Sequence, residues 1–306
     1  MTIALTGLQY EIVAGDYRAT VTELGAGLRE LAFYGQPVIA GYEADELPPA
    51  GAGQLLAPWP NRVDGGRYVF GGTEQHLALT EPARSTAIHG LTRWMPWTVV
   101  SHEASAVRLR NAPHGQQGYP FALEIEAEYR LESGTGLHVA ITARNRGSHA
   151  APYGTGQHPY LTVRTPSVDD CELTLPAGSW LPLDDRGIPS GPAESVEGTP
   201  YDFRKPQLIG TTQLDTSLTG LSRDSGGRAW AQLTDGRAGV ALWAGQGYRW
   251  LQVFTGDSLG PELRRKAVAI EPMTCPPNAF VTGDDLLVLQ PGQAVTHTWG
   301  ITARRD

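Results

Sequence analysis

One stretch of alternating residues limits what this chain can fold into more than any other feature of its sequence. Along Phe121–Leu131 every second residue is apolar, and the residues between them include three glutamates and an arginine. A helix would scatter these charges around its circumference, whereas a strand places them all on one face. After a turn at residues 133–136, a second alternating run extends from Leu137 to Arg144. The two runs predict antiparallel β-structure with one buried and one solvated face.

Shorter runs of the same kind extend through the rest of the chain. Two hairpins are predicted early: Tyr10–Val21, with Gly15 and Asp16 supplying positive φ at its tip, and Tyr68–Leu77, with Gly71 and Gly72 at its tip. Further strands are expected at residues 172–175, 229–233, 239–243, 250–254, 268–270, 286–289 and 295–299. Gly and Pro supply 37 and 23 of the 306 residues, above their usual joint share of ~12%. We find no amphipathic helix longer than about two turns.

The strand pattern runs from residue 10 to residue 300 without a linker that separates two halves. We therefore expect one all-β domain over residues 1–306, a large antiparallel β-sandwich with two or more sheets. In such a fold the loops carry the chemistry. The loop richest in Gly and Pro, Leu183–Pro206, is long enough to form a lid or the rim of a site.

The charge balance excludes several classes of partner. The chain has 24 Lys and Arg against 32 Asp and Glu, a net charge of −8, and so lacks the basic surface of a nucleic-acid-binding protein. It has no polybasic segment, no apolar run near the ~20 residues of a membrane span, and no basic and apolar leader at Met1. Cys171 and Cys275 are too few for a disulfide framework. We expect a soluble cytoplasmic protein that binds neither nucleic acid nor membrane.

Several standard catalytic motifs are missing from the sequence. Gly25-Ala-Gly27 and Gly51-Ala-Gly53 begin like dinucleotide-binding fingerprints, but both lack the third glycine and a following helix. We find no P-loop, no Gly-x-Ser-x-Gly elbow and no His-x-His or His-Glu-x-x-His spacing for a metal. If the protein is an enzyme, acid–base catalysis without a metal or cofactor is the mechanism that remains.

Four segments combine titratable residues with the rigid or permissive backbone of Pro and Gly. They are Pro58–Val63, Ile88–Trp94, Gly154–Tyr160 and Ala269–Asn278. His158 precedes a proline, which favours extended geometry. Glu271 ends an apolar strand and is followed by Pro272, so burial is expected to raise its pKa, which suits a general base.

Each of these residues also has an ordinary structural interpretation. A histidine beside glycine, such as His89, is more often a hydrogen-bonded loop residue than a catalyst. Arg62 alone would most often form a surface ion pair, and a Glu-Pro pair at a strand end is uninformative by itself. The tryptophans are individually more typical of the core than of a ligand platform: Trp59, Trp94, Trp97, Trp243 and Trp250.

The order of the short motifs along the chain resembles the aldose 1-epimerase (galactose mutarotase-like) family. The resemblance covers nearly the whole chain, and its motifs are Gly25–Arg29, Asn61–Val63, Gly66–Phe70, Ile88–Gly90, His158–Tyr160, Leu214-Asp215 and Ile270–Met273. Pro58–Arg62 and His89–Trp94 look most like a bacterial branch of less-characterised aldose-epimerase-like proteins. A proline also stands at Pro159 where galactose mutarotase commonly has threonine. These departures concern the sugar more than the chemistry.

The resemblance implies a cofactor-free and metal-free β-sandwich of the galactose mutarotase type that interconverts the α and β anomers of an aldose. By position, Glu271 looks like the general base for the C1 hydroxyl and His158 like the general acid for the ring oxygen. The remaining positions that match the substrate-binding set are His89 near the ring, Arg62 and Asp215 on sugar hydroxyls, Asn61, and Arg93.

Three alternatives stay open at this point. Arg93 in His89-Gly-x-x-Arg93 is within reach of an anion, so a hexose-6-phosphate or other anionic sugar is the second candidate substrate. A non-catalytic sugar-binding module and a purely structural β protein are the other two. The expected partner is a small aldose, and the chain is expected to be a monomer or a homodimer.

Overall fold

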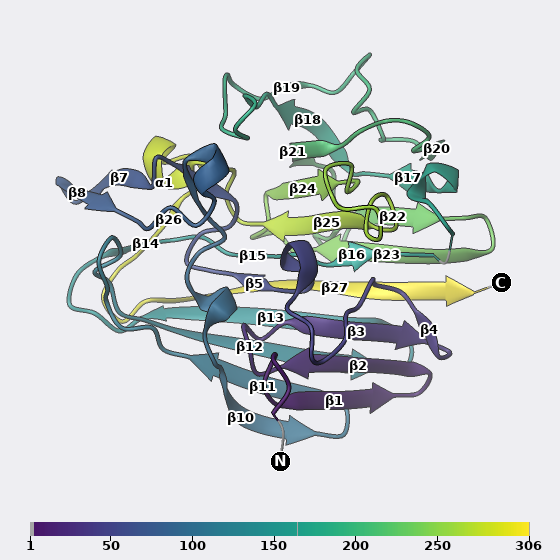
Figure 1. Cartoon of the computed structure of the whole chain (residues 1–306), viewed down its shortest axis with the longest axis horizontal. Coiled ribbons are helices and arrows are strands. Elements are labelled where there is room, and N and C mark those ends of the chain that lie inside the picture. Colours follow the sequence, from purple (N-terminus) through teal and green to yellow (C-terminus); the bar gives the residue numbers. More distant parts are fainter. Residues whose placement is uncertain (1–2, 164, 306) are drawn as a thin grey trace.

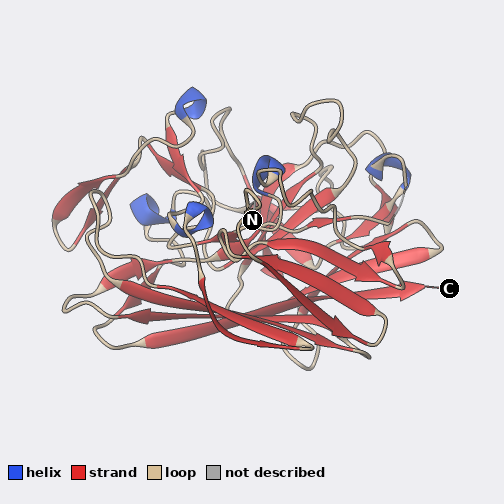
Figure 2. Cartoon of the chain, turned by 60° about the horizontal axis from the view of Figure 1, so that its bottom comes forward, coloured by secondary structure: helices blue, strands red, loops and turns tan. Residues whose placement is uncertain are grey.

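The computed structural model describes residues 3–163 and 165–305, and its regular structure is almost entirely β (Figures 1 and 2). Within these residues the single α-helix is α1 (Ala279–Thr282), and single turns of 3-10 helix occur at Pro49–Gly51, Pro82–Arg84, Thr92–Trp94 and Val168–Asp170. No helix in this part of the chain has the length and apolar character needed to cross a membrane. Figure 2 shows the helical turns gathered on the side of the strand layers that also carries many of the loops.

The largest sheet has nine strands in the order β10-β11-β12-β13-β27-β23-β22-β17-β20. Their bounds are β10 (Thr98–Glu103), β11 (Ala106–Asn111), β12 (Leu123–Glu132), β13 (Gly136–Asn145), β27 (Ala294–Arg305), β23 (Ala238–Ala244), β22 (Ala229–Thr234), β17 (Glu172–Thr174) and β20 (Gln207–Leu208). In β12 buried and partly exposed residues alternate from Leu123 to Leu131, because every second side chain points into the core. The two strands predicted from the alternating runs are therefore confirmed and pair with each other in antiparallel register.

The second sheet has eight strands in the order β19-β18-β21-β24-β25-β15-β5, and β16 also pairs with β25. Their bounds are β19 (Glu194–Ser195), β18 (Ala177–Leu181), β21 (Asp215–Leu221), β24 (Trp250–Phe254), β25 (Val268–Met273), β15 (Gly156–Gln157), β5 (Leu55–Leu56) and β16 (Tyr160–Leu161). β15 and β16 lie end to end along one edge of β25, and the break between them holds His158 and Pro159.

Smaller sheets complete the fold. They are β1 (Gln9–Ala14), β2 (Tyr17–Thr22), β3 (Leu28–Phe33) and β4 (Gln36–Pro37) in one sheet, β14 (Ala151–Tyr153) with β26 (Leu287–Leu289), β6 (Arg62–Asp64) with β9 (Thr86–Ile88), and β7 (Arg67–Phe70) with β8 (Thr73–His76). Both predicted hairpins are confirmed. The tip of the first differs in one detail, because Gly15 takes a positive φ of 56° and Asp16 does not.

The sheets share one large apolar core. Its side chains come from the inward faces of the long strands, among them Ile125, Ile141, Leu242 and Trp299, each of them buried. The purple strands β1 and β2 lie over β12 in Figure 1 and pack against it. The all-β sandwich predicted from the sequence is confirmed. Cys171 and Cys275 are both buried free thiols.

Candidate active site

A cavity of about 390 Å³ opens where the eight-stranded sheet meets the loops around β6 and β9, and all seven predicted site residues line it. They are Asn61, Arg62, His89, Arg93, His158, Asp215 and Glu271. A larger hollow of about 540 Å³ lies beside Trp243 and His297 but contains none of them. The smaller cavity is the candidate site, because it brings together the carboxyl and imidazole groups that the sequence predicted for acid–base chemistry.

Glu271 lies inside β25, opposite Gln252 of β24, and not at the end of its strand as predicted. The strand continues through Pro272 for a physical reason. The N–H groups of Ile270 and Thr274 donate to the carbonyl groups of Pro159 and Thr155 along one edge of β25. The nitrogen of Pro272 faces the same edge, at the break between β15 and β16, so the strand there loses no regular ladder partner.

The carboxyl group of Glu271 is in direct contact with the imidazole of His158. Oε1 of Glu271 is 3.3 Å from Nε2 of His158, and both side chains are almost fully buried. The backbone of His158 is held by its N–H, which donates to Gln54, and by its carbonyl, which accepts from the N–H of Gly53. Its ring stacks on Tyr160 at a centroid distance of 4.9 Å. The acid and base expected from the resemblance therefore meet, although their roles remain predictions.

Burial decides the protonation of this pair. It raises the pKa of Glu271, the nearby Asp215 raises it further, and the Arg62 guanidinium lowers it. Burial lowers the pKa of His158 because the site disfavours a charged imidazolium. Both shifts favour the neutral form of the pair, in which the carboxyl group holds the exchangeable proton and the imidazole is uncharged. The raised pKa expected for Glu271 agrees with this direction.

His89 is held in one tautomer by the neighbouring backbone. The N–H of Asn61 donates to its Nδ1 over 3.2 Å, so the proton of the neutral ring is on Nε2. Both residues have left-handed backbones, with φ of 63° at His89 and 55° at Asn61. Burial lowers the pKa of His89, and His158 lowers it further, which keeps the ring neutral. His89 is thus a hydrogen-bond donor to whatever occupies the cavity.

His89, His158 and Glu271 also bring their ligand atoms within 4.8 Å of one another. The spacing rules applied to the sequence missed this cluster, because its members come from three separate segments. It is nevertheless a poor metal site. Nδ1 of His89 accepts the Asn61 N–H and Nε2 carries the proton, so neither nitrogen offers a free lone pair.

Arg62 is 9% exposed and forms an ion pair with Glu81, a residue that the sequence analysis missed. Nε of Arg62 is 2.7 Å from Oε2 of Glu81, and Nη2 donates to Oε1 over 3.0 Å. The ion pair with Arg62 and the hydroxyl of Thr86 lower the pKa of Glu81, outweighing the opposite effect of burial. The only signal in the sequence was that Glu81, like Glu271, stands directly before a proline.

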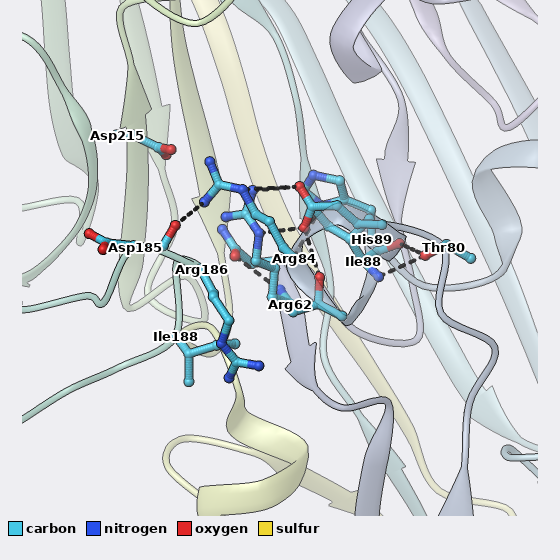
Figure 3. A network of polar contacts seen from close by, with 12 residues as sticks. Arg62, Thr80, Arg84, Ile88, His89, Asp185, Arg186, Ile188 and Asp215 are labelled. Atoms are coloured by element: carbon cyan, nitrogen blue, oxygen red, sulfur yellow. Dashed lines mark hydrogen bonds and ion pairs between the residues drawn. The ribbon is translucent and has the colours of Figure 1, made fainter.

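Asp215 lies at the first position of β21 and lines the cavity, as Arg84 does; both are labelled in Figure 3. Its Oδ1 accepts a 2.7 Å hydrogen bond from Nε2 of Gln252. Gln252 in turn accepts from the hydroxyl of Ser217. Gln252 was also missed, although it stands out as the one polar residue within the apolar strand Trp250–Phe254.

Arg93 and Trp94 stand at the rim of the cavity. Nη1 of Arg93 reaches Oε1 of Gln54 over 3.5 Å, and the guanidinium lies 5.3 Å from the ring centroid of Trp94. Among the described residues Arg93 has no carboxylate within ion-pair distance. Trp94 is 46% exposed. Among the described residues, this end of the cavity therefore presents a cation without an ion-pair partner beside an exposed aromatic ring.

The loop Leu183–Pro206, predicted to be a lid or rim, reaches the site through its first turn. The carbonyl oxygen of Asp185 accepts a hydrogen bond from Nη1 of Arg84, as Figure 3 shows. A Cβ atom at Gly187 would lie 2.6 Å from Nη1 of Arg62. The remainder of the loop includes the edge strand β19.

Comparison with known proteins agrees with this fold and identifies the family. A family model described as aldose 1-epimerase matches residues 9–302. The uncharacterized protein YihR of Escherichia coli (strain K12) is 36% identical over 289 residues, which cover 94% of this chain and 91% of that protein. The galactose mutarotase of Mus musculus is 28% identical over 235 residues, which cover 72% of this chain and 66% of the mouse protein.

A solved structure of a GalM/aldose epimerase homologue from C. elegans has the same fold. It superposes with a TM-score of 0.87 at 19% identity, covering 97% of this chain and 99% of that one. The sandwich is thus of the galactose mutarotase type, as the resemblance implied. Because the family model matches nearly the entire length, the chain belongs to the aldose 1-epimerase family.

Proposed function

We propose that this protein interconverts the α and β anomers of an aldose by acid-base ring opening and closure. The observation that carries the proposal is the 3.3 Å contact between Glu271 and His158 inside a cavity large enough for a sugar. Membership of the aldose 1-epimerase family supports a reaction of this type. The relative from Mus musculus named galactose mutarotase supports it as well.

The reaction needs one proton removed from O1 and one delivered to O5. The carboxyl proton of Glu271 first passes to Nε2 of His158, which the contact permits. Arg62 stabilises the carboxylate that results. The carboxylate then takes the O1 proton while the imidazolium protonates O5, so the C1–O5 bond breaks and C1=O1 forms. Each such group typically contributes about 10²–10⁴-fold.

Closure of the ring returns both protons. The open-chain aldehyde rotates about C1–C2 and presents its other face to O5. His158 then removes the O5 proton as O5 attacks C1, and Glu271 gives the proton back to O1. The site is regenerated with its single proton, so the reaction consumes no cofactor.

The remaining residues of the cavity are suited to holding the sugar. Arg62 offers Nη1 as a donor, Asp215 offers carboxylate oxygens as acceptors, and His89 offers its Nε2 proton. Donors and an acceptor spaced around one cavity match the alternating hydroxyl groups of a pyranose. Asn61 supports this set through the N–H that orients His89.

The test is anomer exchange measured by NMR across a panel of neutral and anionic aldoses. We expect faster exchange with the protein than without it for at least one sugar. If no hexose or pentose, neutral or anionic, equilibrates faster with the protein than in buffer, the proposal is wrong. A silent sugar-binding module would give saturable binding without exchange, and a structural protein would show neither.

A second candidate is an anionic sugar, such as a hexose 6-phosphate. It is favoured by Arg93, which lines the cavity without an ion-pair partner among the described residues. Arg84, which also pairs with Glu81, is a second cation in the same lining. An anionic group there would gain charge-assisted hydrogen bonds. A strong preference for neutral over phosphorylated or sulfonated sugars in the same panel would eliminate this candidate.

A further inference from the structure

The guanidinium of Arg62 is held from two sides by residues outside the predicted site. On one side Glu81 forms a bidentate pair with it, through Nε at 2.7 Å and Nη2 at 3.0 Å. On the other side lies Gly187, where a Cβ atom would meet Nη1 at 2.6 Å. Nη1 is therefore the one terminal nitrogen of Arg62 that Glu81 does not occupy.

Glu81 is itself fixed by its surroundings, so it is a rigid support. Its backbone N–H donates to the carbonyl of Thr86, and the N–H of Thr86 donates back. The hydroxyl of Thr86 donates to Oε2 of Glu81 over 2.7 Å. Nε of Arg84 lies 3.6 Å from Oε1. Both carboxylate oxygens are therefore held, Oε2 by Nε of Arg62 and the hydroxyl of Thr86, and Oε1 by Nη2 of Arg62 and Nε of Arg84.

The turn at Gly187 is equally well defined. Oδ1 of Asp184 accepts from the N–H groups of Arg186 and Ile188, both over 2.9 Å. Gly187 has a φ of 75°, which favours glycine. Nη2 of Arg186 is 2.5 Å from Oδ1 of Asp64, the last residue of β6, which ties the turn to the strand that carries Arg62. Figure 3 shows Arg186 beside Ile188 in this turn and Arg62 nearby.

We infer that Glu81 is a positioning residue, which aims Arg62 at the sugar and balances the positive charge that Arg62 places beside the carboxyl group of Glu271. Gly187 lies on the other side of the Arg62 guanidinium and leaves room for it because it has no Cβ atom. The inference rests on the proposed function, because it concerns the same cavity. It adds two elements that no site motif in the sequence contained.

The charge balance follows from the groups around Glu271. The groups close to it are His158 in the break between β15 and β16, Tyr160 of β16, Asp215 of β21, Arg62 of β6 and His89 after β9. Arg93 of the turn Thr92–Trp94 lines the same cavity. Gln252, opposite on β24, is uncharged. Arg62 lowers the pKa of Glu271, and Glu81 offsets part of that charge. Without Glu81, the field of Arg62 at Glu271 would be stronger.

The test compares Glu81→Gln with Glu103→Gln, a matched change at an exposed position in β10. We expect Glu81→Gln to raise KM and to lower kcat/KM about tenfold, as for loss of a hydrogen bond to a charged group. We also expect the alkaline limb of the pH–rate profile to move to lower pH. Such a shift distinguishes a charge effect from a structural one, which would lower the rate equally at every pH.

Two further variants keep the inference testable if Glu81→Gln folds poorly. Thr86→Val removes the hydroxyl that orients Glu81 without changing charge, so KM should rise about threefold with no movement of the alkaline limb. Glu81→Asp keeps the negative charge, so the alkaline limb of its pH–rate profile should stay at the wild-type pH. Melting temperatures of all variants separate loss of fold from loss of position.

The outcomes are distinct. If Glu81→Gln matches Glu103→Gln in KM and in pH profile, the inference is overturned, and an alkaline limb that moves to higher pH overturns it as well. If the folded wild-type protein exchanges no anomers, the proposed function itself has failed. In that case sugar binding by calorimetry still tests positioning, because Glu81→Gln should weaken the binding about tenfold while Glu103→Gln should not.

Discussion

Oε1 of Glu271 lies 3.3 Å from Nε2 of His158, in a site where burial raises the pKa of the acid and lowers the pKa of the base. Both shifts favour the uncharged form of the pair. A neutral acid and a neutral base in contact share one proton that can reside on either partner. Anomer interconversion requires this property, because ring opening and ring closure use the two groups in reversed roles.

Removing either partner should abolish rapid anomer exchange. We expect Glu271→Gln and His158→Asn each to reduce the exchange rate by at least about 100-fold, since each group contributes about 10²–10⁴-fold. Sugar binding should change little, because Arg62, Asp215 and His89 are untouched. NMR exchange and calorimetric titration of the same samples check this. Retained turnover in Glu271→Gln would show that Glu271 is not the base.

The rate should depend on pH with two limbs that report the shared proton. Because the pKa of His158 is lowered, the pair gains a second proton only in acid well below the usual histidine range. Because the pKa of Glu271 is raised, the pair keeps its one proton above the usual carboxyl range and loses it on the alkaline side. We therefore expect a plateau between these limits in kcat/KM. A single rise near pH 6.5, typical of an isolated histidine, would contradict the shared-proton interpretation.

Gly90 should tolerate no side chain, because the segment that carries His89 crosses the backbone at Ala57. A Cβ atom at Gly90, where φ is 70°, would lie 2.1 Å from the carbonyl oxygen of Ala57. Gly72 has a similar φ of 78° but open space around it. Left-handed strain costs about 1 kcal/mol in both alanine variants, and the clash adds about 1–3 kcal/mol in Gly90→Ala.

Urea unfolding measures the effect of each variant on stability, and NMR exchange measures its effect on activity. Gly72→Ala should be slightly destabilised and fully active, whereas Gly90→Ala should lose both stability and exchange activity. Equal free energies of unfolding for the two variants would show that the close approach at Ala57 is relieved by movement of the loop.

His297 should make the fold less stable in mild acid. Burial lowers its pKa to about 4, while the unfolded chain binds the proton with a pKa of about 6.5. The unfolded state therefore takes up a proton first as pH falls through 6.5, and stability is lost down to the folded pKa. By linkage this amounts to about 2 kcal/mol between pH 7 and pH 5.

His297→Leu removes the group, so the variant should lose less stability than the wild type over that interval. His297 pairs across strands with Ile141, which makes an apolar replacement compatible with the site. Urea unfolding at pH 7 and pH 5 gives the difference, with His114→Gln at an exposed position as the control. If the free energy of unfolding falls equally in the wild type and in His297→Leu between pH 7 and pH 5, the prediction is wrong.

Much of the fold was readable from local pattern. The alternation in Phe121–Leu131 placed β12, because the period of side-chain direction in a strand is fixed by the backbone itself. The left-handed residue of the first hairpin could be located in the same way, because Gly15 has no Cβ atom and adopts a positive φ easily. The seven candidate site residues also emerged from the sequence, through family resemblance carried by short motifs in order.

The predictions that were wrong or missing concern residues whose environment is set by neighbours distant in the chain. Glu271 was expected at the end of a strand, since a proline usually terminates pairing. It lies inside β25 because β15 and β16 leave a break opposite Pro272. Apart from the proline that follows it, Glu81 carried no mark of function, because its contact with Arg62 joins two residues that lie 19 positions apart in the chain.

The sequence by itself determined the class of fold, the strands with clear alternation and the set of titratable residues worth considering, since each follows from side-chain chemistry and short-range backbone preference. Only the tertiary structure decided which proton sits where. The tautomer of His89 depends on the Asn61 N–H, and the neutrality of the Glu271–His158 pair depends on burial by β16, β24 and the surrounding loops. Desolvation and hydrogen-bond geometry are properties of the packed site, so no local pattern contains them.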